Sequence, residues 1–205
     1  MRKMITVKIN GEERQYPQGA TYEDVANDYQ QEYENLIALA ARDGKIRELF
    51  KKLTRDCEVT FFTLKDDVGN KTYVRSATML FLKAVFDVYG REAAQSCRVE
   101  FAIGNGSYIS PKGKINATEE NAAKIRNRMR ELVEAKTPFL KRSYSLDNAM
   151  ELFRKEGMKD KEKLFRYRRG SFVNIYEMDG YYDYYYGYML PNAGYVKWFD
   201  VIAYE

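Results

Sequence analysis

The sequence predicts an α+β protein of two domains, and three observations lead to that prediction. Hydrophobic residues make up 45% of the 205 residues, which is enough to bury a core. Strand-like alternation and helix-like periodicity both occur along the chain, without an internal repeat. A polar stretch containing a glycine, residues 65–70, separates residues 1–64 from residues 71–205 and indicates the domain boundary.

The first domain, residues 1–64, is predicted to be a small sheet with one helix. Residues 4–16 alternate as a β-hairpin does, and Asn10-Gly11 tolerate the positive φ of a type I′ turn. Thr21 is the expected N-cap of a helix. Further strands are expected at residues 36–41 and 57–62. This succession of a hairpin, a helix and more strands describes a β-grasp-like unit.

The second domain, residues 71–205, mixes helices with strands. An apolar helix is expected over residues 71–89, and apolar residues cover most of its circumference, so it should be buried. Thr118 and Ser145 are expected to cap two further helices. The remaining expected elements are a hairpin over 98–110 around Gly104-Asn105-Gly106, a basic helix from Asp160, and strands at about 171–176 and 195–204.

Histidine is absent, which removes the commonest metal ligand and the side chain best suited to proton transfer near neutral pH. The two cysteines, Cys57 and Cys97, are far apart and in no CxxC motif, which is typical of reduced thiols rather than of a zinc site or a disulfide. We therefore expect no metal, no cofactor and no catalytic residue in this chain.

The start of the chain and its hydropathy predict a cytoplasmic protein that does not enter a membrane. No apolar run is long enough to span a bilayer, and Met1-Arg2-Lys3-Met4 leads into a strand pattern rather than into a signal peptide. The net charge of +4 permits contact with phosphates without requiring it.

Two local patterns are candidate binding features. A basic cluster is interleaved with Phe165 and Tyr167, a combination that binds phosphates and stacks on bases; its cations are Lys161, Lys163, Arg166, Arg168 and Arg169. The alternative is a solvated helix face, or pairing with nearby acids. The tyrosine-rich tract 181–188 either lines a ligand groove or partner surface, or packs as the edge of a core.

A polar stripe interrupts the apolar helix 71–89. Arg75, Met79, Lys83 and Asp87 are four residues apart and share one face. This stripe should face something polar, either solvent or a groove.

Two stretches resemble parts of known families. Met4-Ile5-Thr6-Val7, Asn10-Gly11 and the Pro17-x-Gly19-x-Thr21 helix entry make residues 4–62 resemble a TGS domain, a β-grasp module. Residues 71–204 resemble the second additional domain of threonyl- and alanyl-tRNA synthetases, which removes mischarged amino acids. The segments that carry this second resemblance are Arg75–Val85, similar to that family's HxxxH helix, and Asp183–Gly194, similar to its DLCRGPHxPxTG segment.

The departures from the synthetase pattern fall on its functional positions. The helix histidines correspond to Arg75 and Met79, the cysteine to Tyr185 and the last histidine to Met189. Arginine does not release its proton, methionine is neither a base nor a hard-metal ligand, and tyrosine is a poor base at neutral pH. The resemblance therefore implies that the scaffold and its cleft are kept while hydrolysis of aminoacyl-tRNA is lost.

The same order of domains also resembles the N-terminal region of bacterial uridine-kinase-like nucleoside kinases, through Leu164–Arg169, Val173–Tyr176 and Asp183–Tyr188. This resemblance implies a non-catalytic ligand-binding or regulatory module of an ATP-dependent nucleoside kinase whose P-loop domain lies outside this chain. The alternative is a tRNA- or RNA-binding module related to threonyl-tRNA synthetase, with editing activity lost or residual.

The expected site lies between the helix that carries Arg75 and the tyrosine-rich tract, and its ligand is expected to be a nucleotide or an RNA end. Arg75 is the candidate anion contact, and Tyr185 and Tyr186 are candidates for stacking. The full set of candidate ligand-binding residues is Arg75, Met79, Lys83, Asp183, Tyr185, Tyr186 and Met189. Two alternatives stay open: the methionines and tyrosines fill the former metal cavity, or a residual deacylase uses Asp183 near Asp87.

Overall fold

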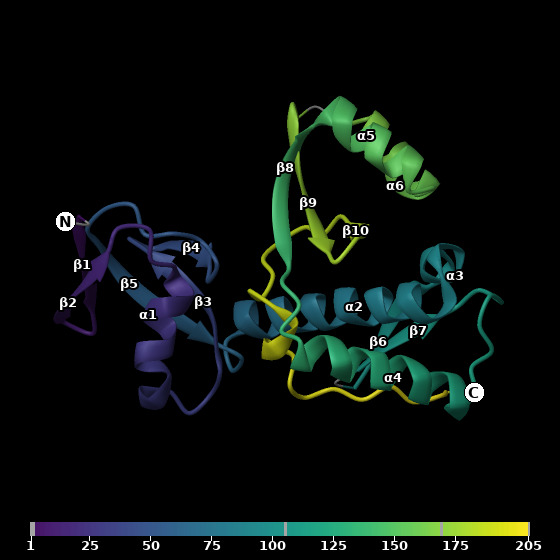
Figure 1. The fold of residues 1–205 in the computed structure, drawn as a ribbon, viewed down its shortest axis with the longest axis horizontal. Helices are drawn as coiled ribbons and strands as arrows, with labels where there is room; N and C mark the ends of the chain where they lie inside the picture. Colours follow the sequence, from purple (N-terminus) through teal and green to yellow (C-terminus); the bar gives the residue numbers. More distant parts are fainter. Residues whose placement is uncertain (1–2, 105, 169, 205) are drawn as a thin grey trace. The chain divides into compact units, whose positions relative to one another are not determined.

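The computed structural model describes residues 3–104, 106–168 and 170–204, and the protein is α+β as predicted (Figure 1). The chain divides into two compact units. One contains the residues up to Ser76 together with Gly187–Pro191, and the other contains Ala77–Tyr186 and the residues from Asn192 onward. Domain borders at residues 64 and 71 stay a prediction. Within the described ranges, no helix is both long and apolar enough to cross a membrane.

The first unit is built on a five-stranded sheet in the order β2-β1-β5-β3-β4. Strands β1 and β5 are parallel, and the other neighbours are antiparallel. A sheet with this order and a helix crossing between its halves is a β-grasp arrangement, as the sequence predicts. The strands are β1 (Met4–Ile9), β2 (Glu12–Pro17), β3 (Ile37–Arg42), β4 (Lys45–Glu48) and β5 (Cys57–Thr63).

Local sequence signals account for the start of this unit. Asn10 and Gly11 both have positive φ, at 51° and 88°, and form the β1–β2 turn. Helix α1 (Tyr22–Tyr29) begins with a capping box, in which the Thr21 hydroxyl accepts from the Asp24 amide and the Asp24 carboxylate accepts from the Thr21 amide. A short 3₁₀ helix, η1 (Gln30–Glu32), follows. Val25 and the ring of Tyr29 are buried, together with Ile5 and Val7 of β1.

The predicted linker 65–70 is largely helical, because helix α2 (Asp67–Tyr89) begins at Asp67. Gly69 indicated a loop in the sequence, but its role is steric. A Cβ at Gly69 would lie 1.9 Å from the carbonyl oxygen of Thr63, so the first turn of the helix can lie against the end of β5 only when this residue is glycine.

Among the residues that the structure describes, the second unit contains five α-helices, including the part of α2 from Ala77 on, and two sheets. Its strands form an antiparallel sheet in the order β10-β9-β8 and a separate hairpin of β6 and β7. The helices are α3 (Arg91–Ser96), α4 (Glu119–Glu134), α5 (Leu146–Lys155) and α6 (Lys159–Arg166). The strands are β6 (Arg98–Ile103), β7 (Gly106–Ser110), β8 (Leu140–Ser145), β9 (Phe172–Met178) and β10 (Tyr181–Asp183). Asn105 of the predicted hairpin turn lies outside the described residues.

Helices α5 and α6 pack on the sheet of β8 and β9 (Figure 1). Thr118 and Ser145 cap α4 and α5 as predicted, and Gly157, with a φ of 73°, follows the end of α5. The buried residues of this part are Ala149, Phe153, Met158, Phe165, Val173 and Ile175.

The strand expected at residues 195–204 is not present. A 3₁₀ helix, η2 (Ala193–Tyr195), precedes an irregular segment. Arg126 of α4 contacts this segment through the Asp200 carboxylate at 3.0 Å and the Val201 carbonyl at 2.9 Å. Side-chain contacts to a helix, rather than a β-ladder, therefore fix the segment.

Both cysteines are free thiols. Burial raises the pKa of the Cys97 thiol from 9.0 to about 11. Because the folded-state pKa lies above the unfolded one, Cys97 contributes stability that is complete below the unfolded pKa and is lost as the pH rises through the folded one.

In a Cys57→Ser protein, alkylation of Cys97 by iodoacetamide should therefore reach half its maximal rate near pH 11. The rate can be followed by mass spectrometry, with circular dichroism at each pH to verify that the protein stays folded. A half-maximal rate at the pH of an unburied thiol, in folded protein, would show that Cys97 is not protected.

Candidate functional site

Within the first unit, Arg75 of α2 contacts the segment 187–191. Its Nη1 donates a hydrogen bond of 2.6 Å to the carbonyl oxygen of Tyr188. Gly187 has a φ of 128°, and a Cβ there would lie 2.7 Å from Cζ of Arg75. The guanidinium therefore occupies the space beside Gly187, and a side chain at residue 187 would displace it.

The residues after Tyr188 are held by two buried polar side chains. The Ser76 hydroxyl accepts a hydrogen bond of 2.9 Å from the Leu190 amide and donates to the Thr72 carbonyl at 2.8 Å. The Met189 amide donates to Oε1 of Glu48 at 3.3 Å. Sequence reasoning missed Ser76 and Glu48, because each contacts a residue more than a hundred positions away and no local spacing connects them.

The four positions that correspond to the synthetase's functional residues do not fit a metal ion. Arg75 is a permanent cation and a hydrogen-bond donor, so it repels a metal ion. Met79 and Met189 are fully buried thioethers, which are poor ligands for hard cations. Tyr185 is half-buried, and a tyrosine side chain is a poor base at neutral pH. These side chains supply neither a ligand set nor a base for an attacking water.

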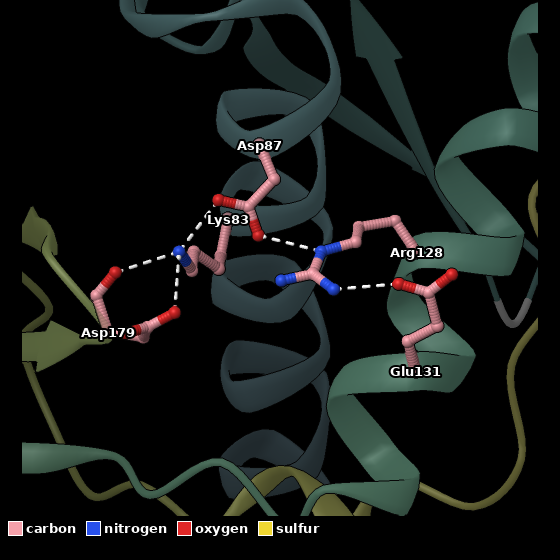
Figure 2. Close-up of polar contacts among 5 residues, drawn as sticks. All are labelled: Lys83, Asp87, Arg128, Glu131 and Asp179. Carbon is pink, nitrogen blue, oxygen red and sulfur yellow. Dashed lines mark hydrogen bonds and ion pairs between the residues drawn. The ribbon is translucent and has the colours of Figure 1, made fainter.

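Lys83 lies at the centre of an ion-pair network in the second unit (Figure 2). Its Nζ is 2.7 Å from Oδ1 of Asp87, 2.7 Å from the carbonyl oxygen of Asp179 and 3.3 Å from Oδ2 of Asp179. The Lys83 side chain is only 3% exposed. An ammonium group has three protons, so each proton has an acceptor within the protein. The geometry gives Lys83 a structural role, and a role in ligand binding stays a prediction.

The network continues beyond Asp87 to helix α4 (Figure 2). Oδ2 of Asp87 accepts from Nε of Arg128 at 2.9 Å, and Nη1 of Arg128 donates to Glu131 at 2.7 Å. Two cations therefore share the Asp87 carboxylate between them. The network connects α2, α4 and the β9–β10 turn, in which Asp179 and Gly180 both have positive φ.

Asp183 is engaged by a different cation. Its Oδ1 lies 2.9 Å from Nζ of Lys161 and also accepts from the Tyr184 amide at 2.7 Å. Burial acts to lower the pKa of Lys161, but the Asp183 carboxylate outweighs it, so this pKa is raised above its ordinary value. A residual deacylase would need Asp87 and Asp183 to act together, whereas each carboxylate is held by its own cations.

The tyrosine-rich tract has both buried and exposed members. Tyr181 is buried, and burial raises its pKa well above the ordinary value. Tyr184 packs edge-on against Phe165, with ring centroids 4.8 Å apart. Tyr186 is 88% exposed and Tyr185 is half-buried. The tract thus contributes to the core at Tyr181 and reaches the surface at Tyr186.

The basic cluster separates into two groups. Lys161 pairs with Asp183, and Arg168 donates to the hydroxyl of Tyr184 at 2.9 Å while lying over the ring of Phe165. Lys163 and Arg166 are exposed, and no acid among the described residues pairs with them. Arg169 lies outside the described residues.

Comparison with known proteins shows that the chain is similar in sequence to threonine–tRNA ligases. Over 208 residues it is 28% identical to the threonine–tRNA ligase of Thermotoga neapolitana, covering 98% of this chain and 31% of that protein. The corresponding ligase of Thermotoga maritima is 28% identical over 207 residues, and that of Porphyromonas gingivalis strain W83 is 25% identical over 194 residues. No family model matches the chain.

The chain is thus similar to threonine–tRNA ligases along nearly its whole length, and it spans about 31% of the length of the first of them. This agrees with the TGS and editing-like resemblance. The uridine-kinase-like resemblance finds no support in these relatives, and the attached kinase domain stays a prediction.

Replacing Lys83 should destabilise the protein far more than replacing Lys71, although both lysines pair with an aspartate four residues away on α2. Lys83→Met removes charge-assisted hydrogen bonds from Asp87, which keeps Arg128, and from the β9–β10 turn at Asp179, so we expect a loss of about 2 kcal/mol in the free energy of unfolding. Lys71→Met removes a pair whose side chains are 65% and 81% exposed, so the loss should stay below about 0.5 kcal/mol. Urea titrations measure both, and equal losses would contradict the structural role of Lys83.

Arg75 and Gly187 should be energetically coupled. Gly187→Ala should cost about 2 kcal/mol or more, because the added methyl group meets the guanidinium in a backbone conformation that disfavours side chains. In an Arg75→Ala background the steric part disappears, so the second substitution should cost about 1 kcal/mol less. A double-mutant cycle in urea measures this coupling, and strictly additive losses would argue against the contact.

Proposed function

We propose that this chain is a non-catalytic RNA-binding module related to threonyl-tRNA synthetase. The observation that carries the proposal is the similarity to threonine–tRNA ligases over 98% of the chain, since those enzymes act on tRNA by name. A likeness along the whole chain, rather than in one element, supports a shared RNA-related role for both units.

The residues at the former editing positions support the non-catalytic part of the proposal. Arg75 and Met189 stand where the synthetase resemblance places histidines, and the chain has no histidine to substitute for them elsewhere. Arg75 is bonded to the Tyr188 carbonyl and Met189 is a fully buried thioether, so neither side chain supplies the base or ligand of a hydrolytic water. RNA binding without hydrolysis is the activity that remains.

Binding of deacylated tRNA should be detectable for the whole chain by filter binding at low salt and should weaken as salt is added, because phosphate contacts release counterions. The same protein should release no amino acid from mischarged threonine tRNA above the uncatalysed rate, and it should contain no stoichiometric zinc.

The two halves of the proposal fail separately. Absence of tRNA binding at low salt would remove the RNA-binding role. Turnover of mischarged tRNA would remove the non-catalytic role even if binding holds. Regulation of an attached nucleoside kinase remains the other interpretation, and the gene sequence that follows the codon for Glu205 would test it by encoding or lacking a P-loop.

A further inference from the structure

Helix α6 carries a row of cations on one exposed face. Lys159, Lys163 and Arg166 are spaced at i, i+4 and i+7, so they lie on one side of the helix. All three side chains are exposed, and none has an acidic partner among the described residues. The row covers about 10 Å along the helix axis. We call these three residues the α6 cation row.

Most of the acidic side chains near the α6 cation row form ion pairs with cations outside the row. Glu162 pairs with Arg154 at 3.1 Å, Glu156 pairs with Arg91, and Asp183 pairs with Lys161. Asp160 is exposed and lies 4.0 Å from Lys161. Glu162, Glu156 and Asp183 are thus paired with cations outside the row. The single charge of Asp160 cannot offset three cations, so the row keeps positive charge that attracts an external anion.

An exposed aromatic ring adjoins the row. Tyr167 follows Arg166 at the end of α6 and is 85% exposed. A tyrosine ring so fully exposed to solvent is available for a partner, because tyrosine rings normally contribute to a core or an interface. Base stacking on aromatic side chains is a principal means of binding unpaired nucleotides.

The opposite face of α6 is already used. Phe165 is fully buried and stacks on Phe153 of α5, with ring centroids 5.1 Å apart. A helix that binds a membrane surface inserts its apolar face, and the apolar face of α6 is occupied by the core. The exposed residues of α6 are mainly charged; Leu164, 59% exposed, is the single aliphatic side chain among them, and Tyr167 follows the helix. This set fits a polyanion with stackable bases better than a lipid surface, which needs a continuous apolar face.

We propose that the α6 cation row and Tyr167 bind an unpaired segment of RNA, with the three cations on consecutive phosphates and the Tyr167 ring on a base. This rests on the proposed RNA-binding function and assigns it to one surface. Unpaired RNA is favoured over duplex because bases in a helix are stacked on one another and leave no face free for Tyr167.

The test uses the whole chain and two variants with equal loss of charge. One is Lys159→Gln, Lys163→Gln, Arg166→Gln. Its control is Lys8→Gln, Lys45→Gln, Lys52→Gln, three exposed lysines of the first unit. The probes are a short labelled single-stranded RNA, the same RNA as a duplex, deacylated tRNA, and phosphatidylserine vesicles. Anisotropy at several salt concentrations gives the affinities for the RNAs, and co-sedimentation gives vesicle binding.

The row variant should bind single-stranded RNA about tenfold more weakly, and the slope of log K against log salt should shrink by about 2, as expected for three lost phosphate contacts. The control should change affinity by less than about twofold. Tyr167→Leu should weaken binding of the single strand roughly tenfold and leave duplex binding unchanged.

The outcomes separate this proposal from the one it rests on. If the unaltered chain binds none of the RNAs, the RNA-binding function fails, and the assignment fails with it. If it binds RNA and the row variant binds equally well, only the assignment to α6 fails. If the row variant and the control lose RNA affinity equally, the loss reflects net charge rather than the α6 surface, and the assignment is wrong. If the row variant loses only vesicle binding and keeps RNA binding, the α6 cation row is a lipid-binding surface and the RNA assignment is wrong.

Discussion

The hydrogen bond from Arg75 to the carbonyl of Tyr188 is the constraint that holds the segment 187–191 in the first unit. It joins residues 113 positions apart, and closing so long a loop costs conformational entropy. Ser76 and Glu48 add two more bonds to the next residues, and Met189 and Leu190 are buried beside them.

The same helix makes a second long-range connection inside the other unit, through chemistry of a different kind. Lys83 is nearly buried, and burial of an ammonium is costly unless its protons find acceptors, which Asp87 and Asp179 supply. Replacing the whole set of paired residues by apolar ones would avoid this cost, whereas removing Lys83 alone would not. The ion pairs are therefore better explained by specificity, because they fix which turn lies against α2. Arg75 thus holds backbone at a position where the synthetase resemblance places a histidine, and Lys83, about two helical turns later, holds a turn.

Local signals predicted the β-grasp unit well, because its turn and its helix cap are each encoded within a few residues, at Asn10-Gly11 and at Thr21 with Asp24. Elements that depend on distant partners were missed. Strand β8 reads Leu-Lys-Arg-Ser-Tyr-Ser, has little apolar alternation, and becomes a strand because it pairs with β9. The strand expected at residues 195–204 is absent for the opposite reason: its apolar alternation finds no strand to pair with among the described residues, and the segment is held by Arg126 through the Asp200 carboxylate and the Val201 carbonyl.

The basic cluster shows why counting charges along a sequence is a poor guide to a surface. In the sequence Lys161 and Lys163 look equivalent, yet two residues on a helix differ by about 200° in direction, so one reaches Asp183 while the other faces solvent. Lys159 was not part of the basic cluster predicted from the sequence. It shares the face of Lys163 because it lies one helical turn before it. Helical phase and the placement of acids together decide which cations remain available, and only the first can be read from the sequence.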